Sequence, residues 1–220
     1  MRPKPICINP AAQRREFCRA ASGVLFCALA ASALLAAPTT HAQQAPRRAP
    51  PPAELAAFTS QSAPWRMLGT GALRFFGFKA YDASLWVMSA STDPLKDKAT
   101  LALDIEYNTA LKAEEIVNVS LVEMARLRKA SEAQIRTWTA QMQKTFPAVQ
   151  KGDKLLGVHL PTVGARFFFN GKLIAEINDP AFSEAFFAIW LDPATKRPEL
   201  RSALLGVGQA VQSAPMRENN

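Results

Sequence analysis

The pair Asn170-Gly171 is the feature that most limits what this chain can fold into. It stands between two apolar runs, 165–169 and 172–177. Both turn residues tolerate the positive φ angles of a tight two-residue turn, so the pair predicts a β-hairpin. Because the strands of a hairpin are antiparallel, the sheet that contains them is predicted to be mainly antiparallel.

A second hairpin is predicted in residues 69–88, GTGALRFFGFKAYDASLWVM. Gly77 at the first central position suits a type II′ turn at Gly77-Phe78. That turn makes Arg74 and Tyr81 direct cross-strand neighbours on one face of the ribbon, with Cβ atoms about 5 Å apart.

The remaining elements follow from periodicity and from helix-end signals. An alternation of period two over 99–107 predicts a strand with one solvated face, and 154–160 reads as another strand. Helices are predicted from Asn108 or Thr109 to about Lys129, from Ser131 (with Gln134 as a capping box) to Pro147, from Asp179-Pro180 to about Asp192, and over 198–205. The order predicts an α+β fold, with a mainly antiparallel sheet of about six strands backed by a layer of helices.

Residues 1–42 have the pattern of a cleaved export signal peptide. A basic segment precedes the apolar stretch 22–37, which is too short to span a membrane comfortably, and Thr40-His41-Ala42 is a small-residue cleavage site. The pair Arg14-Arg15 leaves a twin-arginine route open beside the ordinary secretory route, which we favour. The expected location is periplasmic or secreted, with no stable membrane anchor after cleavage.

The rest of the chain is predicted to hold one domain. Residues 43–63 read as a Pro-rich disordered tether, 64–206 as the folded domain and 207–220 as a flexible tail. Without residues 1–42 the chain loses five basic residues and one acid, so its formal charge falls from +8 to +4. With so mild a charge and no basic run among aromatics, nucleic acid is not expected as a partner.

Several kinds of chemistry are excluded by what the domain lacks. All three cysteines lie in residues 1–42, which removes disulfides, thiol nucleophiles and cysteine-bound metals from the mature chain. His159 is then the single histidine, and a structural or surface role fits it better than a catalytic one. No nucleophile motif, phosphate loop or dinucleotide fingerprint is present. We therefore predict no catalytic residue, no metal site and no cofactor.

Arg74 is the most informative charged residue, because its neighbours Phe76 and Trp86 are strongly apolar. An arginine in such a setting needs an anionic partner, since an unpaired buried charge costs several kcal/mol. Two partners remain open. One is a carboxylate of this chain, Asp104 or Glu106, and the other is the carboxylate of a ligand.

Three passages resemble the bacterial chalcone isomerase-like family: GALRFFGFKAYDASLWV, FFFNGKLIAEINDPAF and FFAIWLDPATKRPELRSALLG. The resemblance runs from about residue 64 to 206. It implies an antiparallel sheet backed by helices, an open-faced sandwich, with a ligand cleft between the two layers.

The resemblance also bears on function. In the plant members that cyclise chalcones, an early arginine is followed by a threonine on the next strand and by a tyrosine and an asparagine on the first long helix. Arg74 matches the arginine, but Tyr81-Asp82 stands in place of the threonine, and residues 114–121 contain no tyrosine. In the fatty-acid-binding members of the superfamily, an arginine and a tyrosine from these two strands hold the carboxylate, and Arg74 and Tyr81 match that pair.

The prediction is therefore a non-catalytic periplasmic protein that binds a small apolar carboxylate such as a fatty acid. The predicted ligand-binding residues are Arg74, Tyr81, Phe76, Trp86, Tyr107 and Met124. One alternative is an isomerase or intramolecular lyase that acts on a chalcone-like or other unsaturated carbonyl compound, with Tyr81 or Tyr107 as the acid. A second is a non-catalytic interaction protein of the cell envelope.

Overall fold

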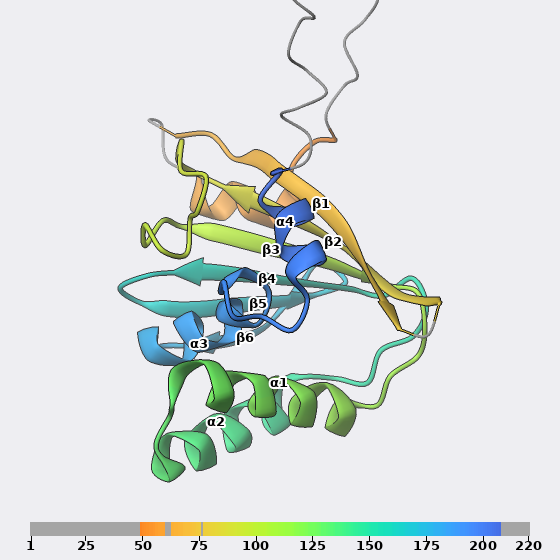
Figure 1. Ribbon diagram of the computed structural model, residues 1–220, viewed down its shortest axis with the longest axis vertical. Coiled ribbons are helices and arrows are strands. Elements are labelled where there is room, and N and C mark those ends of the chain that lie inside the picture. Colours follow the sequence, from red (N-terminus) through yellow and green to blue (C-terminus); the bar gives the residue numbers. More distant parts are fainter. Residues whose placement is uncertain (1–48, 60–62, 76, 208–220) are drawn as a thin grey trace, which may run out of the picture. The chain divides into compact units, whose positions relative to one another are not determined.

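Six strands and five helical segments make up the part of the chain that the computed structural model describes, residues 49–59, 63–75 and 77–207 (Figure 1). The strands are β1 (Arg66–Phe75), β2 (Phe78–Val87), β3 (Leu101–Tyr107), β4 (Lys154–Leu160), β5 (Gly164–Phe169) and β6 (Lys172–Ile177). The helices are η1 (Ala53–Phe58, a 3-10 helix), α1 (Ala113–Arg128), α2 (Glu132–Thr145), α3 (Pro180–Leu191) and α4 (Pro198–Leu204).

The sheet is a meander in which every neighbouring pair of strands is antiparallel. Its order is β1-β2-β3-β4-β5-β6, the order of the sequence. The predicted Asn-Gly hairpin is confirmed: Phe169 pairs with Lys172, and Asn170 and Gly171 have φ angles of 47° and 83°. The α+β fold predicted from the sequence is confirmed as well.

The helices form a layer on one face of the sheet. Helix α3 packs on β4 and β5, α1 packs on α3, and α4 lies over β1 and β2 (Figure 1). The Asp179 side chain caps α3 by accepting from two backbone N–H groups of its first turn, and Ser131 and Gln134 form the predicted capping box of α2.

Aromatic side chains fill the space between α3 and the sheet. Phe186 of α3 stacks on Phe182 and meets Phe167 of β5 edge-on, with ring centroids 5.9 and 5.0 Å apart. Gly157 of β4 makes room for this cluster, because a Cβ there would lie 3.1 Å from the ring of Phe187. The core is therefore centred on α3, β4 and β5.

The opposite face of the sheet is partly covered by η1. Leu55 of η1 is fully buried, and its carbonyl oxygen accepts a hydrogen bond of 2.9 Å from the indole of Trp65. Leu55 and Trp65 form a second apolar cluster with Trp86, Ala102 and the side chains of β4 that point the same way. The prediction of a disordered tether over 43–63 is thus wrong for residues 53–58, because their apolar side chains pack against the sheet.

Helix α1 begins at Ala113, later than predicted, because the chain bends at residues 108–109 and Leu111 then forms a bridge with Val149. The predicted signal peptide, 1–42, and all of the predicted tail except Val207 lie outside the described residues. Within the described residues, no helix has both the length and the apolar character needed to cross a bilayer.

Candidate functional site

The β1–β2 hairpin differs in register from the sequence prediction. Phe75 pairs with Phe78, so the turn is centred one residue earlier than Gly77-Phe78, and Gly77 occupies its second central position with φ 83°. A bulge lies between Leu73 and Arg74, on the β1 side of the turn. The predicted pairing of Arg74 with Tyr81 is therefore wrong.

Arg74 instead lies opposite Lys79 and is exposed to solvent. Asp82 is the acidic residue near both cations. Its carboxylate accepts a hydrogen bond of 2.6 Å from Lys79, and this bond, with a smaller contribution from the charge of Arg74, holds the pKa of Asp82 below its usual value. The prediction that Arg74 sits in an apolar pocket is wrong in this structure, because Arg74 lies next to the hairpin turn and its side chain is exposed.

Tyr81 points into the layer between sheet and helices, where it meets Tyr107 and Trp190. Trp190 of α3 donates a hydrogen bond of 2.8 Å from Nε1 to the Tyr81 hydroxyl oxygen. The rings of Tyr81 and Tyr107 meet edge-on, 6.0 Å apart. The two tyrosines pair directly across β2 and β3, so the sheet register holds them side by side.

Both phenol groups remain protonated over the physiological pH range. Burial raises the pKa of Tyr81 to about 12, against a lowering by the Trp190 hydrogen bond and the charge of Arg197. Burial also raises the pKa of Tyr107, and the neighbouring Tyr81 adds to this rise. Neither hydroxyl proton has an acceptor among the described residues. The pair thus presents two neutral O–H donors.

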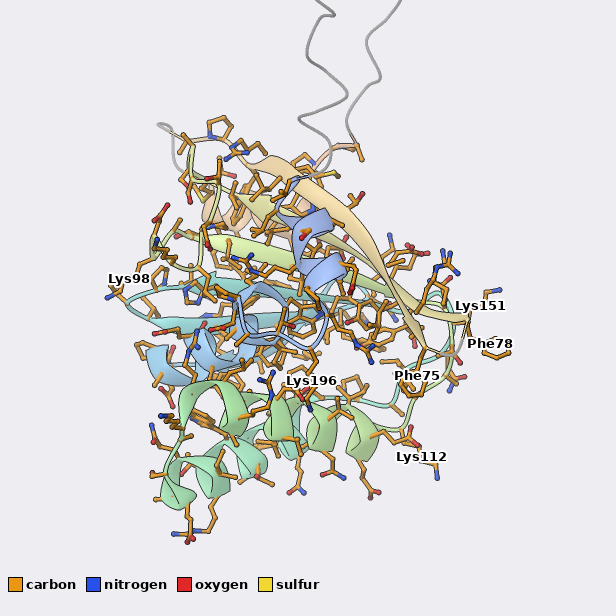
Figure 2. All side chains as sticks on the ribbon, in the orientation of Figure 1. Phe75, Phe78, Lys98, Lys112, Lys151 and Lys196 are labelled. Carbon is orange, nitrogen blue, oxygen red and sulfur yellow. The ribbon has the colours of Figure 1, made fainter. Side chains whose placement is uncertain are left out.

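Arg197 lies at the same end of the molecule. Its guanidinium carbon is 5.8 Å from the centre of the Phe75 ring, and its charge acts on Tyr81. Among the described residues no carboxylate lies within ion-pair distance of Arg197. Figure 2 shows Phe75 and Phe78 at the hairpin tip and Lys112 ahead of α1 at this same end. Two phenols and a guanidinium therefore converge where the hairpin meets the helical layer.

The other predicted site residues are distributed over both faces of the sheet. Met124 of α1 is fully buried in the core on the helix side, as are the inward-facing residues of β2 and β3. Trp86 belongs to the apolar cluster on the opposite face, so the sheet separates it from Tyr81. Phe76 lies outside the described residues.

The sequence profile of the family described as chalcone isomerase-like matches residues 55–206. This chain belongs to the chalcone isomerase-like family. A curated relative from Haemophilus influenzae, described only as an uncharacterized protein, is 25% identical over 142 residues, which is 64% of this chain and 68% of the relative.

A solved structure confirms the fold of this chalcone isomerase-like protein. A fatty-acid binding protein of Arabidopsis thaliana superposes with a TM-score of 0.53, covering 67% of this chain and 88% of that one. The two chains are 8% identical, so the likeness extends to the fold alone.

His159 has a structural role in this chalcone isomerase-like protein. It is buried in β4, and its Nδ1 lies 2.6 Å from the Ser183 hydroxyl. Burial lowers the pKa of His159 to about 4. A cavity of about 500 Å³ beside it also contains Arg128, whose guanidinium is paired with Asp192 at 2.6 Å and with Glu184 at 3.3 Å. The charge of Arg128 is therefore paired within the protein.

The described residues contain no cluster of three or more histidine, cysteine or acidic side chains that could hold a metal ion. Sequence reasoning identified both tyrosines but not Trp190 or Arg197 as their neighbours. Trp190 is 109 positions from Tyr81, so no local pattern could indicate their hydrogen bond. The one available signal was the basic pair Lys196-Arg197 directly before the helix-starting Pro198.

Proposed function

We propose that this chalcone isomerase-like protein is a non-catalytic binding protein of the periplasm for a small apolar carboxylate such as a fatty acid. One observation carries the proposal. Tyr81 and Tyr107 lie side by side, both protonated and both without an acceptor for the hydroxyl proton among the described residues. A carboxylate supplies the acceptors that these donors lack, and charged acceptors form the stronger hydrogen bonds.

In this proposal, a guanidinium from the hairpin end neutralises the carboxylate. Arg197 and Arg74 are the candidates, since neither forms an ion pair with a carboxylate among the described residues. Arg197 is the nearer candidate, because its charge acts on Tyr81 and its guanidinium lies over the ring of Phe75, the residue that follows Arg74 in the chain. The ligand-binding roles predicted for Arg74 and Tyr81, and the role now proposed for Arg197, can each be tested by substitution.

The apolar body of the ligand would extend from Tyr81 between sheet and helices. Leu73, opposite Tyr81, is only partly buried and is the first apolar surface that it would meet. Beyond it, Met124 of α1 has a flexible side chain that can repack around a guest. Each methylene of the ligand removed from water contributes about 0.8 kcal/mol.

The direct experiment is native mass spectrometry of the protein isolated from the periplasm, followed by titration with fatty acids of increasing chain length. Tyr81→Phe removes one hydrogen bond to a charged group, worth about 1.5–3 kcal/mol, and should weaken binding by about 10- to 150-fold. Arg197→Gln and Arg74→Ala are measured in parallel. Asp82→Asn, on the other face of the sheet, is the control. Equal affinity in wild type and Tyr81→Phe would refute the site.

A second candidate function rests on the same two phenols. A pair of neutral O–H donors can polarise the carbonyl group of an unsaturated ketone, and this is the first step that an isomerase of this kind would need. The raised pKa values oppose a further role as general acid or base at neutral pH. Turnover of a chalcone panel that is lost in Tyr81→Phe would favour this enzyme over the binding protein.

The periplasmic location rests on the pattern of residues 1–42. Cell fractionation and N-terminal sequencing of the purified protein test it. The expected mature N-terminus is Gln43, and a full-length chain recovered from the cytoplasm would contradict the proposal.

A further inference from the structure

A cavity of about 480 Å³ lies on the face of the sheet opposite the helical layer. It is bounded on one side by the segment that leads into η1 and on the other by side chains of β1 to β5. Trp86, Leu156 and Phe168 form its apolar wall. The volume is in the range of small-molecule sites in proteins. The sheet separates this cavity from Tyr81, so it is distinct from the site proposed above.

The indole N–H of Trp86 has no hydrogen-bond partner among the described residues, although Trp86 is only 3% exposed. The other three tryptophans all have one. Trp65 donates to a backbone carbonyl at 2.9 Å, Trp138 to Asp179 at 2.9 Å and Trp190 to Tyr81 at 2.8 Å. A buried donor without an acceptor costs about 1–3 kcal/mol. Trp86 therefore needs an acceptor from outside the described residues.

Asp104 is a half-buried carboxylic acid that lines the same cavity. It lies on β3 two positions from Ala102, the residue that pairs with Trp86, so the two side chains are diagonal neighbours on one face. The Asp104 carboxylate forms no hydrogen bond or ion pair with another described side chain or backbone group. Burial raises the pKa of the Asp104 carboxyl; the charge of Lys154 opposes this rise, and Glu54 adds to it.

The lining as a whole is acidic. Its described charged groups are the carboxylates of Glu54, Asp104 and Glu106 and the ammonium of Lys154, which lies 3.3 Å from Glu106. One lysine cannot neutralise three carboxylates, so the cavity keeps an excess of negative charge in a chain whose formal charge is +8. An anionic ligand is therefore disfavoured here, and a cation is favoured.

We propose that this cavity binds a small organic cation, an amine with an apolar body and one acceptor oxygen. Its ammonium pairs with the Asp104 carboxylate, and its oxygen accepts the hydrogen bond of the Trp86 indole. Its apolar body packs on Phe168 and Leu156. A ligand of this class would give both the Trp86 indole N–H and the Asp104 carboxylate a partner, and its apolar body would contact the apolar lining.

Three related probes separate these contributions. Tyramine carries the ammonium, the ring and the oxygen; phenethylamine lacks the oxygen, and p-cresol lacks the ammonium. Calorimetric titration should give tyramine the highest affinity, with p-cresol at least tenfold weaker. The Trp86 indole N–H resonance, assigned with Trp86→Phe, should shift on addition of tyramine but much less with phenethylamine.

Variants test the same assignment. Asp104→Asn should weaken tyramine binding at least tenfold, while Asp82→Asn, an exposed carboxylate on the same sheet face outside the cavity, should leave it unchanged. Trp86→Phe should weaken tyramine but change phenethylamine less than threefold. Equal tyramine affinity in wild type and Asp104→Asn would overturn the proposal.

The chain itself offers a competitor, because Arg47 and Arg48 directly precede Ala49, which lines the cavity. The titrations are therefore repeated with an Arg47→Gln/Arg48→Gln variant. Binding that is tighter in this variant and still depends on Asp104 supports the proposal. Absence of tyramine binding in both wild type and this variant refutes it.

Discussion

Mild acid should destabilise this protein through His159. The imidazole is 3% exposed, its Nδ1 lies 2.6 Å from the Ser183 hydroxyl, and its ring centroid is 5.4 Å from that of Phe187. Burial lowers its pKa to about 4 in the folded protein, against an ordinary value near 6.5. The unfolded chain therefore binds a proton at this residue before the folded protein does.

The sign and size of the effect follow from linkage. The contribution of neutral His159 to stability is fully present above pH 6.5 and is lost as the pH falls toward 4. The slope in that window approaches about 1.4 kcal/mol per pH unit. Between pH 7 and pH 5 the free energy of unfolding should fall by about 2 kcal/mol, which corresponds to a melting temperature about 4–8 °C lower.

Urea unfolding of wild type and of His159→Gln at pH 7, 6, 5.5 and 5 measures this contribution. Glutamine can still hydrogen-bond to Ser183 but does not titrate. The carboxyl groups with lowered pKa, such as Asp192, act below this window, and Asp104, whose raised pKa acts in the opposite direction, is present in both proteins. Stability curves that stay parallel from pH 7 to pH 5 would refute the assignment of the effect to His159.

Three substitutions test the fold. Leu55→Ala should lower the free energy of unfolding by about 2–5 kcal/mol, because Leu55 is fully buried. Leu173 is half-exposed, so Leu173→Ala should lower it far less. Equal small losses in urea unfolding would mean that η1 does not pack on the sheet. Gly164→Ala should destabilise the protein more than Gly152→Ala, although both glycines have positive φ. A Cβ at Gly164 would lie 2.0 Å from a carbonyl oxygen, whereas a Cβ at Gly152 would meet nothing within 4 Å. Thermal melts that rank the two variants the other way would contradict this close approach at Gly164. Trp138→Phe should cost about 1–3 kcal/mol by removing the 2.9 Å hydrogen bond to the carboxylate that caps α3, and an unchanged melting temperature would show that this bond contributes little.

Local signals in the sequence were sufficient for most of the architecture. The Asn170-Gly171 turn, the Ser131 capping box and the Asp179-Pro180 helix start each depend on residues within four positions of one another, and each is present in the structure. Such signals work because turn and cap energies are decided by nearby backbone groups. Both tyrosines of the candidate site were also identified from sequence, although the register assigned to one of them was wrong.

Tertiary structure alone decided which side chains meet. The hairpin turn is centred one residue earlier than its sequence signal predicts, which places Arg74 opposite Lys79, and the bulge between Leu73 and Arg74 changes the register again before Tyr81; a two-residue turn signal encodes neither feature. Tyr81 meets Trp190 only because α3 packs on the sheet, and Trp86 faces a different cavity from Tyr81 because alternate residues of a strand point to opposite faces. Amino-acid order thus determined the elements of this protein, while long-range packing, which no short window of sequence contains, determined the composition of its sites.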